Sequence, residues 1–452
     1  MMNVAVIMSL RGLPLMAKEG LSLIFYLAFA AFFFLIPISL VSAELATGWP
    51  DGGGVFRWVK EAFGSHAGFT AIFLQWIQNV VWYSTILSFA AGALAYFFLD
   101  PALSQNKIFV VSVILIIYWG ATFLNFKGLK MSGMLSTIAV IAGTLLPGVF
   151  IILLGAIWFF SGSPLAFMEN LVIVPDFSSL SNLSFLAGIL LLFAGMEVSS
   201  VHALEVKNPK KDYPKAILLS VLITLIIFFL GSLAVAAVIP GDKIQLTTGL
   251  MQAFHEMLIQ YKMEWMLPIL GLLIALGAIG GVVAWIIGPS KGLLRTAKDG
   301  DLPPILAVTN KKGVPVNILF VQGGVVTLLS LIFLFAPNVG TAFFILTALT
   351  VILYLIMYLL LYSAAIHLRY KYPKKARPYK IPGGNIGMWI VSGVGIIAAL
   401  FGIILGFIPP TQLKVDNPAA YVWFLAAGTL FFVALPIIFI TTRTKGSHDR
   451  KK

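Results

Sequence analysis

The sequence contains no cysteine and very few charged residues. Only 10% of its 452 residues are Asp, Glu, Lys or Arg, whereas 60% are hydrophobic and the mean hydropathy is +1.00. The absence of cysteine excludes disulfide bonds, a thiol nucleophile and thiolate metal ligands. The scarcity of charge excludes a soluble globular domain, in which about 25% of residues are charged. The composition therefore predicts a polytopic integral membrane protein.

Long apolar runs recur along the chain, and each is long enough to cross about 30 Å of hydrocarbon as a helix. We predict an all-α fold with twelve transmembrane helices, so that residues 1–452 form a single membrane domain. The predicted spans are 1–16, 21–43, 67–98, 107–126, 132–160, 183–203, 215–239, 265–288, 315–335, 340–367, 388–408 and 419–441. A short amphipathic piece from Gly249 to Tyr261 is expected to lie at the membrane interface.

Lysine and arginine fall mainly into alternate connections between these spans. With the N-terminus in the cytoplasm, the cytoplasmic connections are 44–66, 127–131, 204–215, 289–314, 368–387 and the tail 442–452. They hold 24 of the 30 Lys and Arg residues, whereas the external connections hold five. This bias predicts that both termini are cytoplasmic in a cell membrane. The formal charge of +13 then reflects topology and contact with anionic lipid at the cytoplasmic face, not nucleic-acid binding.

Two predicted spans carry a charged residue in their interior, and the other ten carry none there. The first reads Ser9-Leu10-Arg11-Gly12-Leu13-Pro14, and the sixth reads Phe193-Ala194-Gly195-Met196-Glu197. Glycine tolerates non-helical backbone, and proline cannot donate to a helical hydrogen bond. Irregular backbone at membrane depth is tolerated only where it lines a cavity or is buried in protein. We therefore predict that helices 1 and 6 are broken beside a binding site.

The two broken helices lie five spans apart, which predicts two inverted five-helix repeats with the substrate between them. Residues 1–160 would form the first repeat and 183–367 the second, followed by two additional helices in 388–441 and a short basic tail, 442–452. Half-helix N-termini suit a carboxylate, and exposed carbonyl groups suit an ammonium group. The candidate binding residues are Ser9, Leu10, Arg11, Gly12, Phe193, Ala194, Gly195 and Glu197.

Arg11 and Glu197 also have a second interpretation, because they could form a structural ion pair across the bundle. The two interpretations overlap, since a substrate could intercalate into such a pair. Gly195 alone would indicate helix packing. Its position beside Glu197, five spans after Arg11 and Gly12, favours a broken helix.

Several motifs of the chain resemble the amino acid–polyamine–organocation superfamily and, more narrowly, the bacterial glutamate/GABA antiporter group and its amino-acid permease relatives. They are Ser42–Thr47, Gly53–Val59, Gly195–Ser200, Asn208–Pro214, Trp285–Gly292, Gly300–Pro303 and Gly313–Val316. The resemblance covers essentially the whole chain. It implies an amino-acid exchanger with the LeuT-like, five-plus-five inverted-repeat fold. It also implies that Glu197 lines the site, and that Tyr354 and Tyr358, which share one helix face, line the pathway.

The chain departs from the antiporter group at three places. Arg11 stands in the first-span break, which is rich in glycine and serine elsewhere in the superfamily. Gly281 occupies a position that is acidic in that group, and the sequence ends at Lys452 without the group's long C-terminal plug. These departures argue against transferring glutamate/GABA exchange in acid resistance to this chain. Only eight residues precede Ser9, so we expect either a start upstream of Met1 or a truncated first half-helix.

The predicted function is secondary active transport of amino acids, without metal or cofactor. The span around Gly281 has no Ser or Thr between Met266 and Pro289, so the oxygen ligands of a sodium site are missing there. Glu197 is the candidate for proton coupling. We predict an antiporter that exchanges an amino acid for a related one or for its decarboxylated amine. The alternatives are a proton-coupled amino-acid or polyamine symporter and, more remotely, a sensor. The spans contain no catalytic constellation, so we predict that the protein is not an enzyme.

Overall fold

The computed structural model describes residues 9–50, 53–127, 129–169, 171–198, 209–413, 415 and 417–449. These residues form helices and no strand, which confirms the all-α prediction. They contain eleven helical segments long and apolar enough to cross a membrane, and these correspond to eleven of the twelve predicted spans. The remaining predicted span, 1–16, falls partly on residues 1–8, and the end of the sixth, 199–203, also lies outside the described residues.

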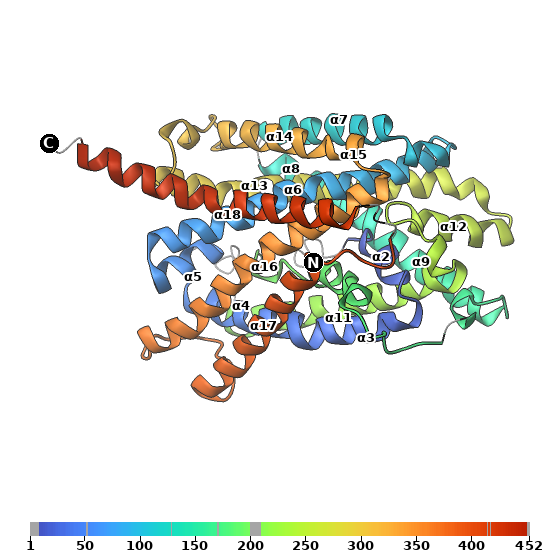
Figure 1. Ribbon diagram of the computed structural model, residues 1–452, viewed down its shortest axis with the longest axis horizontal. Coiled ribbons are helices and arrows are strands. Elements are labelled where there is room, and N and C mark those ends of the chain that lie inside the picture. The colour runs from blue at the N-terminus through green and yellow to red at the C-terminus, as the bar shows by residue number, and fades with distance from the viewer. Residues whose placement is uncertain are drawn as a thin grey trace.

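The helices are arranged as a bundle with one long axis (Figure 1). They are α2 (Gly12–Ala17), α3 (Leu23–Ala30), α4 (Ile36–Gly48), α5 (Gly54–Phe63), α6 (Ser65–Phe97), α7 (Lys107–Phe126), α8 (Leu129–Val140), α9 (Leu146–Phe160), α10 (Phe185–Leu192), α11 (Pro209–Val238), α12 (Gly249–Gln260), α13 (Leu267–Lys298), α14 (Val316–Ser330), α15 (Ile332–Phe335), α16 (Val339–Lys371), α17 (Gly384–Gly406) and α18 (Pro418–Asp449). The amphipathic piece that begins at Gly249 forms helix α12.

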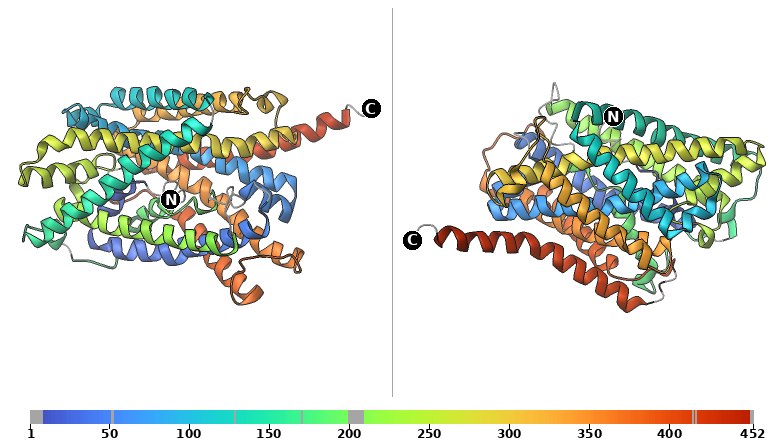
Figure 2. Two further views of the ribbon diagram at one scale, coloured as in Figure 1. Left: turned by 180° about the vertical axis from the view of Figure 1, so that it is seen from behind. Right: turned by 90° about the horizontal axis from the view of Figure 1, so that it is seen from above.

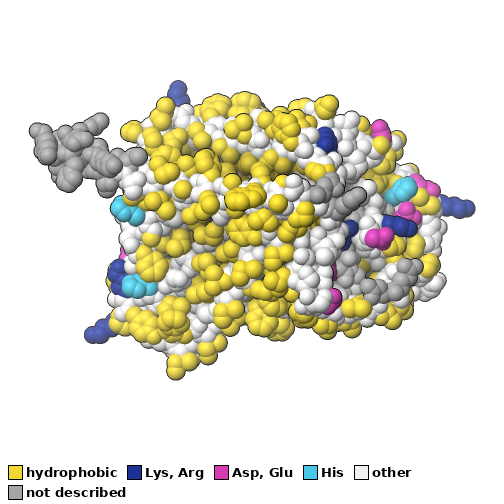
Figure 3. All heavy atoms as spheres, in the orientation of Figure 1, with side chains coloured by type: hydrophobic (Ala, Val, Ile, Leu, Met, Phe, Trp, Pro, Cys, Tyr) yellow, Lys and Arg dark blue, Asp and Glu magenta, His cyan; other side chains and the backbone are white. Residues whose placement is uncertain are grey.

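Two long helices, α6 and α13, pack along each other through the bundle, and α16 packs against α6 at an oblique angle (Figures 1 and 2). Helix α5 lies at one end of the bundle and α12 at the opposite end, so we name these the α5 end and the α12 end. Hydrophobic side chains cover most of the face between the two ends, while charged and histidine side chains gather near the ends (Figure 3). This distribution is the one expected for a protein that spans a bilayer.

Two of the spans contain a π-helical turn, one at Ala31–Leu35 and the other at Ile141–Leu145. Each turn is followed by a proline near the start of the next helix, Pro37 in α4 and Pro147 in α9. A proline ring clashes with the carbonyl group four residues earlier and has no N–H to donate. The wider turn accommodates this clash, so each span continues instead of ending at its proline.

Glycine brings the turn at Ile141–Leu145 into direct contact with α13. A Cβ atom added to Gly143 would overlap the backbone at Leu273 and Gly277, and one added to Gly277 would crowd the backbone of Gly143. Small residues allow this close approach between membrane helices. The contact holds the α8–α9 span against the long helix α13.

Three helix ends differ from the predicted boundaries. Helix α13 continues through Pro289 to Lys298, so the predicted connection 289–314 begins too early. Helices α4 and α16 extend to Gly48 and Lys371, so Glu44 and Arg369 belong to helices and not to loops. Both side chains are buried, with exposed fractions of 1% and 2%. Buried charge in the bundle is therefore not confined to Arg11 and Glu197.

Glu44 and Arg369 form a two-pronged ion pair between α4 and α16. The Nε and Nη2 atoms of Arg369 each donate to one carboxylate oxygen of Glu44 at 2.6 Å. The Nε atom of Arg377 lies 3.3 Å from Oε1, and the backbone N–H of Ile381 donates to Oε2 at 2.8 Å. The single carboxylate of Glu44 thereby fastens the connection after α16 to the end of α4.

We predict that Glu44→Gln lowers the free energy of unfolding by about 3–5 kcal/mol, because the buried Arg369 loses its counter-charge. The matched control is Asp299→Asn, which removes an exposed ion pair with Lys60 and should cost at most about 1 kcal/mol. Unfolding of the detergent-solubilised protein measures both effects. An equal decrease in the free energy of unfolding in the two variants would show that the buried Glu44–Arg369 pair contributes no more to stability than an exposed pair.

Candidate functional site

Two irregular segments, one before α2 and one after α10, meet inside the bundle. Residues 9–11 form a turn before α2, and α10 ends at Leu192. A Cβ atom added to Gly12 would lie 2.5 Å from the side chain of Leu192, so the two segments are in close contact. Gly195 has a φ of +111°, a backbone conformation that L-residues rarely adopt. After α10 the chain therefore leaves the helical path at Gly195, whereas α2 begins at Gly12 directly after the turn of residues 9–11.

The carboxylate of Glu197 is buried and surrounded by hydrogen-bond donors. Gln75 Nε2 on α6 and the hydroxyl of Tyr354 donate to Oε1 at 3.0 and 2.6 Å. The hydroxyl of Tyr358 donates to Oε2 at 2.6 Å and accepts the N–H of Gly195 at 2.8 Å. The rings of Tyr354 and Tyr358 stack with centroids 4.8 Å apart. Three donors suit an ionised carboxylate, which can only accept.

Arg11 is also buried, and it is held by neutral groups. Its Nη1 atom donates to Thr85 Oγ1 on α6 at 2.9 Å and to Thr347 Oγ1 on α16 at 3.4 Å. Its guanidinium carbon lies 5.4 Å from the ring centroid of Phe343. Arg11 forms no ion pair with Glu197, so the structural-pair interpretation does not describe this conformation.

A cavity of about 50 Å³ lies beside Arg11. Its wall consists of Ser9, Arg11, Gln78, Asn79, Trp82, Leu191, Leu192, Ala194, Trp285 and Tyr354. Arg11 is the one charged side chain in this wall. Gln78 and Asn79 donate their amide groups to the carbonyl oxygen of Gln75 at 3.1 and 3.4 Å, so their own side-chain oxygens stay available as acceptors.

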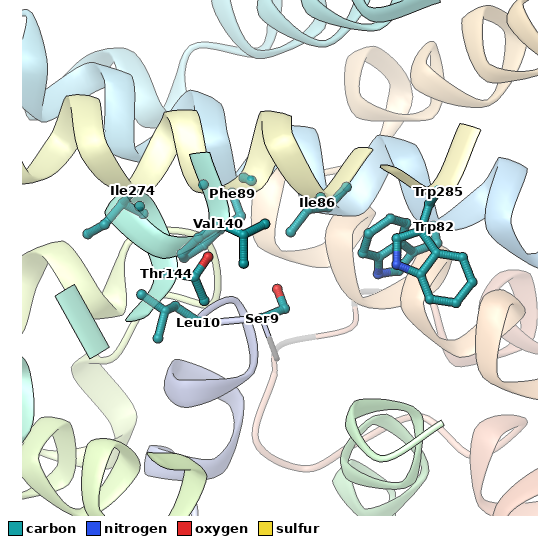
Figure 4. A pocket seen from close by; sticks show the side chains of 13 residues that line it. Ser9, Leu10, Trp82, Ile86, Phe89, Val140, Thr144, Ile274 and Trp285 are labelled. Carbon is teal, nitrogen blue, oxygen red and sulfur yellow. The ribbon is translucent and has the colours of Figure 1, made fainter. Parts of the chain in front are cut away.

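A second, smaller cavity of about 30 Å³ shares Ser9, Trp82 and Trp285 with the first. Figure 4 shows the two tryptophan rings side by side at one end of it, and Leu10, Val140 and Thr144 grouped at the other. The ring centroids of the tryptophans are 6.1 Å apart. Apolar side chains and the glycines of the α13 contact make up most of the remaining wall. The smaller cavity is therefore an uncharged extension of the larger one.

The structure divides the predicted site residues into two groups. Those that line a cavity are Ser9, Leu10, Arg11, Ala194 and Tyr354. Those that line neither cavity are Gly12, Phe193, Gly195, Glu197 and Tyr358. The ring of Phe193 packs edge-on against Phe228 of α11. Tyr354 links the groups, because it lines the larger cavity and its hydroxyl contacts Glu197.

Sequence reasoning missed the contribution of α6, which supplies Gln75, Gln78, Asn79, Trp82 and Thr85. These residues recur at intervals of three or four and therefore share one face of the helix. A search for charged residues passes over them because all are neutral. A search for polar residues at helical spacing within an apolar span would have found this stripe.

The sequence matches the family model of amino acid permeases over residues 1–432. It is 46% identical to an uncharacterised transporter of Legionella pneumophila, over 97% of this chain and 94% of that protein. It is 32% identical to a glutamate/gamma-aminobutyrate antiporter of Lactococcus lactis, over 99% of this chain and 90% of that protein. A probable agmatine/putrescine antiporter of the same species is 24% identical, over 83% of this chain and 79% of that protein.

We predict that Gly195→Ala destabilises the protein by roughly 1–3 kcal/mol, because alanine strains the backbone at φ +111°. An added Cβ would meet Trp285 only at an ordinary distance of 3.5 Å, so the cost comes from the backbone and not from a clash. Gly324→Ala in α14 is the control, because no atom lies within 4 Å of its added Cβ. The control should be neutral or slightly stabilising. An unchanged unfolding midpoint in Gly195→Ala would contradict the strained conformation.

Proposed function

Because the chain belongs to the amino acid permease family, we propose that it is a secondary active transporter that exchanges amino acids across the membrane. The exchanged molecules are an amino acid and either a related amino acid or its decarboxylated amine. The observation that carries this proposal is the cavity beside Arg11, whose wall is formed by the irregular segments and by the polar stripe of α6. A cation, neutral acceptors and tryptophan rings together suit a small zwitterion.

The same proposal includes the arrangement of the chain in the membrane. Twelve spans would form inverted repeats, 1–160 and 183–367, with broken helices 1 and 6 and two additional helices in 388–441. The contact between Gly12 and Leu192 supports this, because it brings equivalent segments of the two repeats together at the cavity. The α5 end would face the cytoplasm with both termini, where its basic side chains would contact anionic lipid.

Glu197 would act behind the cavity and not within its wall. A protonated Glu197 has an O–H to donate, but all of its present partners donate to it. Taking up a proton would therefore require the hydroxyl of Tyr354 or Tyr358 to turn. Because both tyrosines belong to α16, protonation would loosen the tie between α16 and the segment after α10. The opening of the cavity would in this way depend on pH.

A proton-coupled symporter is the second candidate, and the burial of Glu197 favours it. A buried carboxylate that changes its protonation state during the cycle would move a proton together with the substrate. Exchange and symport differ in one measurable respect. An exchanger needs a substrate on the opposite side of the membrane, whereas a symporter needs only a proton gradient.

We predict that purified protein in liposomes shows counterflow, in which internal unlabelled amino acid speeds the uptake of labelled amino acid. The rate should not depend on sodium, because no hydroxyl ligands lie between Met266 and Pro289. Uptake driven by a proton gradient into empty liposomes would favour the symporter. Binding without any flux would favour a sensor, and a requirement for sodium would contradict the proposed coupling.

We predict that Glu197→Gln abolishes the pH dependence of counterflow while the protein still folds. Glutamine keeps the size of glutamate but cannot take up a proton, and its NH₂ group faces existing donors. The control is Glu256→Gln on α12, whose side chain is 58% exposed. Initial rates between mildly acidic and mildly basic pH test both variants. An unchanged pH profile in Glu197→Gln would remove Glu197 from the coupling step.

A further inference from the structure

Arg11 has one edge of its guanidinium group without a partner. The Nη1 atom makes both hydrogen bonds to the threonines, and Nε, although buried, has no acceptor. The side chain is only 3% exposed, yet it contributes to the wall of the larger cavity. No carboxylate among the described residues pairs with it. A buried cation that has no carboxylate partner favours the binding of an anion that enters through the cavity.

Thr85 and Thr347 determine which edge of Arg11 stays available. The hydroxyl proton of Thr85 is already committed to the carbonyl oxygen of Trp82 at 2.8 Å, so its oxygen can only accept from Arg11. The guanidinium group is planar and rigid. Two acceptors at Nη1 and the Phe343 ring beneath the plane therefore fix the direction of the opposite edge. That edge carries Nε–H and presents the geometry that binds a carboxylate with two parallel hydrogen bonds.

We propose that Thr85 and Thr347 are positioning residues that aim Arg11 at the substrate, and that the site exchanges only molecules that carry a carboxylate. This inference rests on the proposed exchange function and narrows its substrate class. Amino acids and ω-amino acids fit, because a carboxylate meets Arg11 while the amine meets the neutral oxygens of Gln78 and Asn79. Amines that have lost their only carboxylate do not fit, since they would place a second cation beside Arg11.

The test uses pairs of molecules that differ only in the carboxylate. Arginine is compared with agmatine, ornithine with putrescine, and leucine with 3-methylbutylamine, together with 4-aminobutyrate. Two measurements are made for each molecule: thermal stabilisation of the purified protein, which reports binding, and counterflow in liposomes, which reports exchange. Within each pair, only the carboxylate-bearing member should stabilise the protein and drive counterflow.

Variants of the two threonines test the positioning role. Thr85→Val and Thr347→Val keep the side-chain shape and should each raise the half-saturation concentration of a carboxylate substrate about tenfold. The preference for the carboxylate-bearing member of each pair should decrease at the same time. Thr85→Ser keeps the hydroxyl group and should restore both the half-saturation concentration and this preference. The control is Thr350→Val, because Thr350 lies in the same helix and donates to Leu346 but does not contact Arg11. It should leave both quantities unchanged.

The outcomes separate this inference from the exchange function. Counterflow with agmatine or putrescine as fast as with the matched amino acid would overturn the carboxylate requirement and leave exchange intact. Binding restricted to carboxylates without counterflow would overturn exchange and support the role of Arg11. Unchanged discrimination in both valine variants would overturn the positioning role of the threonines. Stabilisation by no member of the panel would contradict both proposals.

Discussion

A charged group inside an apolar helix bundle has to be matched by opposite charge or by hydrogen bonds, and this requirement organises the interior of the protein. The described residues meet it in three ways. Glu44 is paired with Arg369 and is thereby fixed. Glu197 is surrounded by neutral donors whose hydroxyl groups can turn. Arg11 is matched on one edge only. In the function proposed above, structural attachment, response to protons and recognition of a ligand would therefore fall to different charges.

The sequence predicted most of the fold, because hydrophobic length is a local property. Eleven predicted spans correspond to helices in the structure, and Gly195 marks the point where the chain leaves the helical path after α10. Boundaries were less certain, because helices α4, α13 and α16 continue beyond the ends of the apolar runs. Pro289 lies inside α13, and the prolines after the π-helical turns interrupt nothing. Neighbouring structure accommodates a proline in ways that local sequence does not reveal.

The candidate site was predictable as a location but not as an arrangement. Charge made Arg11 and Glu197 conspicuous, yet the side chains that separate Glu197 from the cavity come from α16, far along the chain. The partners of Arg11 were hidden for another reason. Threonines are common in membrane helices and often bond to their own backbone. Only the tertiary structure distinguishes Thr347, which contacts Arg11, from Thr350, which does not.

The glycine contact between the Ile141–Leu145 turn and α13 has a mechanical consequence. Side chains that interdigitate across an interface resist sliding of the two surfaces, because their rotamers have to change before the surfaces move. Gly143 and Gly277 contact each other through their backbones and have no side chains that could interdigitate. At this point, therefore, neither segment has a side chain that would have to change its rotamer before the two backbones shift against each other. Both glycines also border the smaller cavity, so the spacing of the two segments at this contact sets the width of the cavity there.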